Sequence, residues 1–397
     1  MPIINADILV WARETADLSV EEAAKKLSIN DAYGKTPSER LAELESGQKD
    51  PTRAMLKKMS KQYHRPLLTF YLAEPPAKGD RGEDFRKLPS IKSSKNEALL
   101  DALIRDVLAR QSLFRSALID EEEENEVRLD FIDSKSTNDG VENVLQSIKD
   151  YLKFDLEEFR KKNKISDAFK ILRKKVEDIG VYVLLLGNLG SHHTNLDVET
   201  FRGFALSDPY APFIIINDQD SRSAWSFTLL HELTHLFLGQ TGVSGAYPFT
   251  QIEKFCNDVA SEFLLPSQEL DLFEHIHQLS DDEIIEEINK FSRKRNISRS
   301  MVAYRIYRAN LINKDRWLYL HRTFNNQWHQ TQKIQRKNVR KSTGAPSYYV
   351  VRRHRLGSAI LKTTKRFMGT GALTTTKAST VLGVKPKNVQ KLLETTT

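Results

Sequence analysis

Cysteine is nearly absent from this chain of 397 residues, in which Cys256 is the only example. A single thiol cannot form an internal disulfide, so the sequence excludes the class of small proteins held together by disulfide frameworks. We therefore expect a reducing, cytoplasmic setting. We interpret Cys256 as a small buried residue rather than a nucleophile or ligand, because free cysteines are commonly buried.

Long apolar runs are lacking too. No stretch of the sequence approaches the roughly 20 apolar residues that are needed to span a bilayer. Residues 1–7 do not combine a basic region with a following apolar one, so we expect no secretory signal and no membrane partner. The length predicts two to four domains with ample core.

Acidic residues are scarce only at the C-terminal end. Residues 315–397 hold seventeen Lys or Arg and two acidic residues, a net charge of +15, whereas the whole chain carries +7 and residues 1–314 therefore carry −8. This asymmetry predicts a basic module attached to an acidic body. We favour DNA as its partner, and a contact with acidic residues of the same chain or of a second copy in a homodimer is the alternative. The candidate phosphate contacts are Lys333, Arg336, Lys337, Arg340, Lys341, Arg352, Arg353 and Arg355.

The most informative residues that are present form an HExxH motif at His231, Glu232 and His235. On a helix, residues four apart share one face, so the two imidazoles can bind one metal ion. Glu232 would then stand beside that ion as a general base. The neighbouring residues 225–230 are apolar enough for a buried helix. The alternative is a helix with two ordinary histidines, since short motifs also arise by chance.

A hydrolytic zinc site needs a third protein ligand and an open position for water. Glu253 follows His235 by eighteen residues and opens a second helical run. Asn257 lies one turn later, where it could orient Glu253 or His231.

Two segments resemble the core of the ImmA/IrrE family of metallopeptidases. The first combines Ile214-Ile215-Ile216-Asn217, Arg222 and the HExxH helix, and the second runs from Ile252 through Asn257 to Pro266. The resemblance implies that His231, His235 and Glu253 bind Zn²⁺, with Mn²⁺ as the alternative metal. One departure is Thr234, where the family usually has glycine before the second histidine.

Residues 1–76 resemble the helix-turn-helix module of XRE-type repressors, especially in Leu44-Glu45-Ser46-Gly47 followed by Pro51-Thr52. Within this module, Ser19 and Glu22 form a capping-box pattern that predicts a helix start. We expect a linker and helical region at 77–178, the peptidase core at 179–279, a helix-turn-helix-like region at 280–314 and a basic helical domain at 315–397. Acidic residues in the third predicted helix, residues 36–45, disfavour DNA binding by the first module.

Three short apolar runs, at 181–185, 203–206 and 213–216, predict a small sheet before the HExxH helix. The fold class is therefore α+β and mostly helical, with a zincin-like core between helical modules. Such peptidases hold an extended substrate at a sheet edge, and Ile214, Ile215, Ile216 and Asn217 are our candidate edge strand. The alternative is that this strand lies inside the sheet.

These observations favour a zinc-dependent endopeptidase with Glu232 as the catalytic base. The resemblance implies limited, regulatory cleavage of a protein partner, either a helix-turn-helix repressor in a stress or phage circuit or the antitoxin of a toxin–antitoxin pair. Tyr247 and Arg222 are candidates for stabilising the oxyanion. The rival hypothesis is a regulator that binds DNA or a partner and whose metal site is structural or vestigial.

Overall fold

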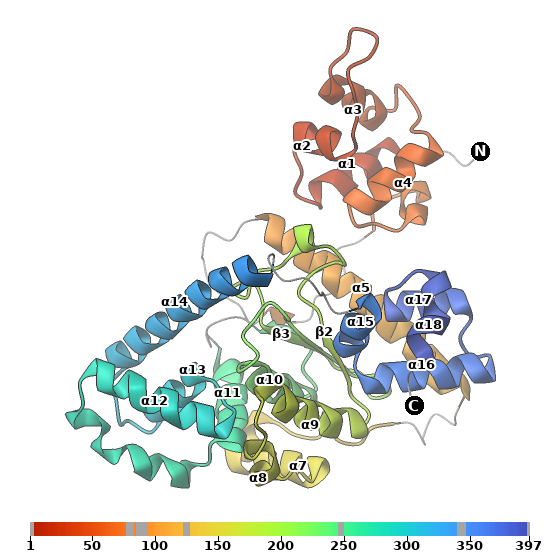
Figure 1. Cartoon of the computed structure of the whole chain (residues 1–397). Coiled ribbons are helices and arrows are strands. Elements are labelled where there is room, and N and C mark those ends of the chain that lie inside the picture. The colour runs from red at the N-terminus through yellow and green to blue at the C-terminus, as the bar shows by residue number, and fades with distance from the viewer. Residues whose placement is uncertain are drawn as a thin grey trace. The chain divides into compact units, whose positions relative to one another are not determined.

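A computed structural model describes residues 4–76, 83–84, 94–121, 128–244, 250–339 and 347–394 of the chain. The fold is α+β and mostly helical (Figure 1). The chain divides into two compact units. The first unit comprises residues 1–81, 89–107 and 188–196, and the second comprises residues 82–88, 108–187 and 197–397. Among the described residues, none of the helices is both long enough and apolar enough to cross a membrane.

The first unit contains four short helices around a small core of its own. They are α1 (Ala6–Glu14), α2 (Val20–Lys26), α3 (Pro37–Glu45) and α4 (Arg53–Gln62). The predicted capping box of Ser19 and Glu22 is confirmed at the start of α2, and Thr36 caps α3 in the same way. Ten residues separate α2 from α3, whereas a helix-turn-helix usually has a turn of 3–4 residues. The resemblance to an XRE-type module is therefore not confirmed.

The second unit is built on a five-stranded mixed sheet of order β1-β5-β3-β4-β2. Its strands are β1 (Glu83–Asp84), β2 (Tyr182–Leu185), β3 (Gly203–Leu206), β4 (Phe213–Ile216) and β5 (Gly242–Ser244). The three predicted apolar runs thus form β2, β3 and β4. β4 pairs in parallel with β2 and antiparallel with β3, so it lies inside the sheet. Our expectation of an edge strand at Ile214–Asn217 was wrong, and the reason is that a wholly apolar strand is buried on both sides.

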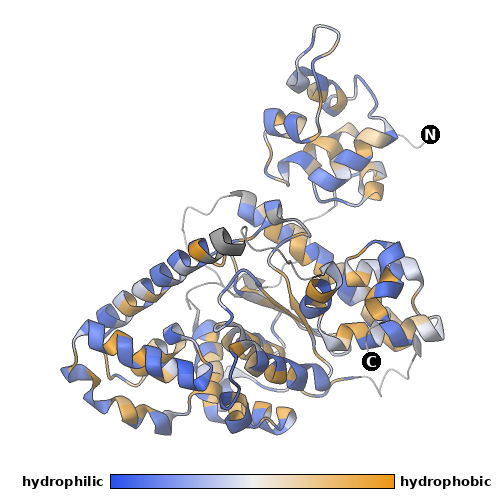
Figure 2. Cartoon of the chain, in the orientation of Figure 1, coloured by the Kyte–Doolittle hydropathy of each residue, from blue (hydrophilic) through white to orange (hydrophobic). Residues whose placement is uncertain are grey.

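Both faces of the sheet are covered, which explains why β2, β3 and β4 are buried throughout. Alternate side chains such as Val183 and Ile214 join the core formed with α10 (Trp225–Phe237). On the opposite face, Phe114 of α5 (Ser94–Glu121) contacts the rings of Tyr182, Phe213 and Phe367. Figure 2 shows hydrophobic residues gathered on the strands and hydrophilic residues along the outer helices α12 and α14.

Further helices surround this sheet. They are α7 (Gly140–Leu152), α8 (Leu156–Arg160), α9 (Ile165–Asp178), α11 (Gln251–Leu264), α12 (Asp281–Arg295), α13 (Arg299–Arg308), α14 (Lys314–Val339), α15 (Tyr348–Leu356), α16 (Ser358–Thr370), α17 (Thr375–Leu382) and α18 (Val389–Leu393). Short 3₁₀ segments occupy 67–71, 137–139, 192–194, 267–278 and 386–388.

A buried ion pair attaches the C-terminal helices to the core. Arg173 and Glu177 of α9 are paired at 2.9 Å, and both are more than nine-tenths buried. Arg173 donates to the carbonyl of His354, and Glu177 accepts hydrogen bonds from the backbone of Ser358 and Ala359 at the start of α16. The carboxylate therefore caps α16 where the helix dipole favours a negative charge.

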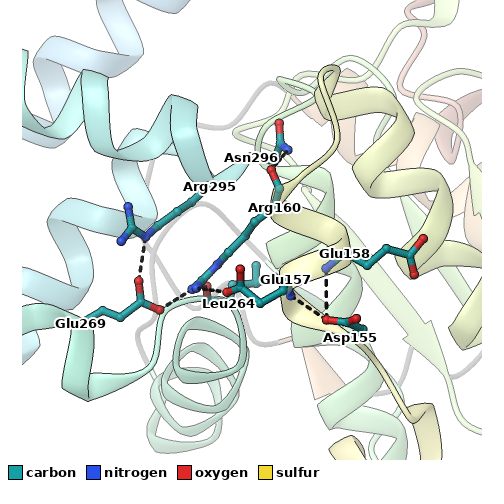
Figure 3. A network of polar contacts seen from close by, with 8 residues as sticks. All are labelled: Asp155, Glu157, Glu158, Arg160, Leu264, Glu269, Arg295 and Asn296. Carbon is teal, nitrogen blue, oxygen red and sulfur yellow. Dashed lines mark hydrogen bonds and ion pairs between the residues drawn. The ribbon is translucent and has the colours of Figure 1, made fainter.

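A second polar network joins α8 to the end of α11 and to α12 (Figure 3). Glu269 bridges Arg160 of α8 and Arg295 of α12, and Arg160 also donates to the carbonyl of Leu264 at 3.2 Å. Asn296, just after α12, donates to three backbone carbonyls of residues 159–162. These contacts hold the helices that surround α11 in one arrangement.

Candidate metal centre

The centre is built on α10, which runs through the middle of the second unit. All but one of its thirteen residues are buried, including the polar residues of the HExxH motif. It packs against β3, β4, α9 and α11. His231 and His235 therefore lie one turn apart inside the protein, only 4% and 1% exposed.

The third group comes from the first turn of α11. Thr250 caps this helix by accepting a hydrogen bond from the backbone of Glu253 at 3.1 Å, and the Glu253 side chain is 2% exposed. Its carboxylate lies 3.1 Å from Nε2 of His235 and 3.4 Å from Nε2 of His231. The two Nε2 atoms are themselves 3.1 Å apart. The predicted trio thus converges, with all donor atoms within 4.8 Å of one another.

This donor set fits a zinc ion. Zinc takes imidazole nitrogen and carboxylate oxygen at about 2.0–2.2 Å in a tetrahedron, which puts neighbouring donors roughly 3.3 Å apart. The three separations of 3.1, 3.1 and 3.4 Å agree with that spacing. Three protein ligands leave one position open, as in catalytic rather than structural zinc sites. The buried group could therefore bind a metal ion.

Electrostatics favour the charged carboxylate. Burial opposes ionisation of Glu253, but the two histidines outweigh it and lower the pKa of Glu253 to about 2. Burial likewise opposes a charge on His231, but Glu253, Glu232 and a hydrogen bond with Asn257 together raise its pKa. The role of Asn257 in orienting Glu253 or His231 stays a prediction. A permanently ionised Glu253 is the form that binds a cation.

Glu232 is fully buried on the same helix, and β3 approaches it closely. A Cβ atom added to Gly203 would lie 2.7 Å from Oε1 of Glu232 and 2.7 Å from Cγ2 of Thr228. Only glycine fits there without displacing the carboxylate. Sequence reasoning did not single out Gly203, because only the packing of β3 on α10 reveals the lack of space.

Cys256 is buried, as predicted, and its Sγ lies 3.7 Å from Nδ1 of His235. Burial raises the pKa of its thiol well above the ordinary value. Its position three residues after Glu253 was the available signal for this contact, and we had not used it. Thr234 is also fully buried, and its hydroxyl donates to the carbonyl of Leu230 at 2.8 Å. The Thr234 hydroxyl, at the position where the family usually has glycine, therefore has a hydrogen-bond acceptor within α10.

Other candidates lie elsewhere. Glu262, the other glutamate of α11, accepts hydrogen bonds from Ser267 and Arg305 instead. Arg222 lines a separate cavity that contains none of the three metal-binding candidates. Tyr247 falls outside the described residues, so its role as an oxyanion partner stays a prediction.

Three of the eight candidate phosphate contacts near the C-terminus have partners within the chain, and phosphate binding by this cluster stays a prediction. Arg352 is buried and donates to the carbonyl of Leu382, and Arg355 forms an ion pair with Asp218 at 2.7 Å. Arg353 is half-buried and donates to the carbonyl of Leu392. These arginines serve packing within the chain, since the C-terminal helices need partners for their last carbonyls. Lys333 is exposed, whereas the side chains of Arg336 and Lys337 and the whole of Arg340 and Lys341 lie outside the described residues.

Comparison with known proteins gives one family match. Residues 178–307, which contain β2, β3, β4, β5, α10 and α11, match the peptidase family described as the IrrE N-terminal-like domain. No curated protein and no solved structure gave a significant match. The match supports a metallopeptidase-like function with a zincin-like domain. Over residues 178–307 it also supports the resemblance to the ImmA/IrrE family.

Proposed function

We propose that the chain is a zinc-dependent endopeptidase that makes limited cuts in a protein partner. The observation that carries the proposal is the convergence of His231, His235 and Glu253 around one point, with Glu232 buried on the same helix. A purely structural site needs no base at that position, so the intact Glu232 favours an enzyme over a regulator with a vestigial site.

Each residue then has a distinct role. His231, His235 and Glu253 would hold the metal, which when bound supplies Lewis-acid chemistry by polarising a carbonyl and acidifying water. Glu232 would accept a proton from the attacking water and deliver it to the nitrogen of the departing amine. Cys256 contacts His235 and would help to keep its ring in place, and Asn257 would orient His231 or Glu253.

On the side of β3 and β5, the sheet ends at the edge strand β1. β3 lies against Glu232, β5 pairs with β3, and the two-residue β1 pairs with β5 at the margin. A peptide that adds to this side of the sheet would be held by main-chain hydrogen bonds, which give affinity without strict sequence demands. This edge replaces β4 in our proposal for substrate binding. For the substrate we keep the repressor or antitoxin that the resemblance implies.

The test uses the full chain purified with zinc, together with the protein encoded beside it. Glu232→Gln keeps the size of the side chain but removes its basicity. We expect unchanged zinc content and loss of a discrete cleavage product, seen by mass spectrometry. A Glu232→Gln chain that cuts at the wild-type rate would overturn peptidase action at this site and leave the regulatory hypothesis.

A further inference from the structure

A second cavity lies in the same unit, apart from the metal centre. Its volume is about 570 Å³, within the range of roughly 300–1,000 Å³ that is typical of small-molecule sites. It opens beyond the carboxyl ends of β2 and β4, where ligands bind in many α/β sheets. Its walls come from the loop 218–222, the first residue of α10, and parts of α14 and α15.

The walls of the cavity contact one another, so its shape is set before a ligand binds. Gln332 of α14 donates to the carbonyl of Gln219 at 3.0 Å, and Arg355 of α15 pairs with Asp218. The rings of Trp225 and His354 face each other with centroids 6.3 Å apart. Trp328 of α14 completes an aromatic lining. Aromatic walls of this kind bind flat ligands by stacking.

The charges of the lining favour an anion. Both carboxylates already have arginine partners, since Asp218 pairs with Arg355 and Asp220 pairs with Arg202 at 3.2 Å. Arg222 is exposed and has no ion-pair partner among the described residues. Its guanidinium is therefore available to a bound phosphate or carboxylate, which it can contact with two hydrogen bonds.

The start of α10 adds to this preference. The helix begins at Trp225, and its N-cap residue, Ala224, offers no side chain to the first backbone N–H groups. Such a helix start attracts anions.

We propose that this cavity binds a small molecule that joins a flat aromatic ring to an anionic group. None of the three metal-binding candidates lines it, so this site is separate from the metal centre. His231 lies six residues after Trp225, about 9 Å further along the same helix. A ligand in the cavity therefore touches the helix that carries the HExxH motif.

Isothermal titration of the full chain tests the proposal without any measurement of cleavage. The probes are AMP, which carries a phosphate, and indole-3-acetate, which carries a carboxylate, and they distinguish the two sources of negative charge. We expect one of them to bind with a stoichiometry of one and to quench tryptophan fluorescence through Trp225 and Trp328. Inorganic phosphate lacks the flat ring, and adenosine lacks the negative charge. Each should therefore bind at least about tenfold more weakly than the probe that binds.

Variants then locate the site. Arg222→Ala should weaken the probe that binds by about tenfold or more, and Arg222→Lys should restore part of that loss. Lys362→Ala, at an exposed cation of α16 outside the cavity, is the matched control and should change affinity less than twofold. Absence of saturable binding of both probes at millimolar concentration would overturn the proposal. Equal affinities of the Arg222→Ala and Lys362→Ala chains would overturn it as well.

Discussion

Glu253 is costly to bury as a charged group, and it is also one of the three candidate metal ligands. An ionised carboxylate that is only 2% exposed is costly to bury unless cations or donors surround it, and the two histidines provide this environment. Removing the carboxylate takes away one of three metal-binding groups. Glu253→Ala should therefore lower metal affinity by at least about tenfold, as measured by elemental analysis after dialysis against zinc buffers.

The control for that experiment is Glu262→Ala on the same helix. Glu262 contacts Ser267 and Arg305 rather than the histidines, so metal content per folded chain should stay at the wild-type level. Loss of metal from the Glu262 variant, with retention in the Glu253 variant, would assign the third ligand to Glu262 instead.

Gly203 lies so close to Glu232 that a larger residue there would press on the proposed catalytic base. In Gly203→Ala the new methyl group would press on the Glu232 carboxylate and on Thr228, at 2.7 Å from each. We expect cleavage to fall at least about tenfold while zinc content is kept, because misplacement of a catalytic group by about 1 Å can cost a hundredfold. Gly369→Ala, where no atom lies within 4 Å of the added carbon, is the control and should cleave normally. Full activity of the Gly203 variant would argue that β3 moves away from Glu232.

At the scale of elements, helix starts can be recognised from the sequence, whereas contacts between helices cannot. The capping residues Ser19 and Thr36 mark helix starts that the sequence also predicted, and Ser280 caps α12 in the same way. Such local signals lie within one turn, so they can be recognised without knowledge of the fold. The contact between two elements is different, because it depends on side chains far apart in the sequence, such as Arg160 and Glu269 in Figure 3.

Asn296 combines a helix end with such a contact. It is 6% exposed, adopts a left-handed backbone with φ of 57°, and donates to carbonyls of residues 159, 160 and 162 at 2.8–3.2 Å. Asn296→Ala should destabilise the protein by about 2–4 kcal/mol, since it leaves carbonyls unpaired and puts a Cβ-bearing residue without a polar side chain in this conformation. Thermal or chemical denaturation measures the change.

The Asn296→Gly variant separates the two causes. Glycine adopts the left-handed conformation without cost, so this variant loses only the amide contacts and should be more stable than the alanine variant by about 1 kcal/mol. If glycine were no better than alanine, the backbone conformation would contribute nothing to the loss.

At the scale of the whole molecule, the C-terminal helices belong to the second unit and pack on its sheet. The net charge of these helices does not show which of their arginines are already engaged within the chain. Arg352 and Arg355 add to the +15 of residues 315–397, yet both are engaged inside the chain. Binding of nucleic acid by the remaining basic residues stays a prediction, and titration with DNA at two salt concentrations would test it.

Burial of His321 of α14 makes the stability of the molecule depend on pH. Burial, followed by the nearby Arg202 and Arg322, lowers the pKa of this histidine from 6.5 to about 4. The unfolded chain therefore binds a proton more readily, so stability is complete above pH 6.5 and falls as the pH drops from 6.5 towards 4. The loss from this residue is at most about 3 kcal/mol.

Melting temperatures at pH 8 and pH 5 measure this effect. His321→Asn should show a smaller drop between the two pH values than the wild type, because the titrating group is gone. His329→Asn, at an exposed position of the same helix, should show the wild-type drop. An unchanged drop in the His321 variant would place the pH sensitivity in other groups.

The sequence by itself determined the elements and the core of the candidate site. The capping boxes, the apolar runs of β2, β3 and β4, and the HExxH spacing are local patterns, so neighbouring residues are sufficient to recognise them. The pairing of Glu253 with the two histidines came from a family resemblance, since no local rule connects residues eighteen positions apart.

Only the tertiary structure decided the rest. It placed β4 inside the sheet rather than at an edge, and it engaged Arg352 in packing rather than leaving it for a phosphate. It also brought Gly203 against Glu232 and Cys256 against His235. The physical reason is the same in each case. Strand order, burial and contact between distant residues depend on how whole elements pack, and a sequence pattern specifies only which face of each element is apolar.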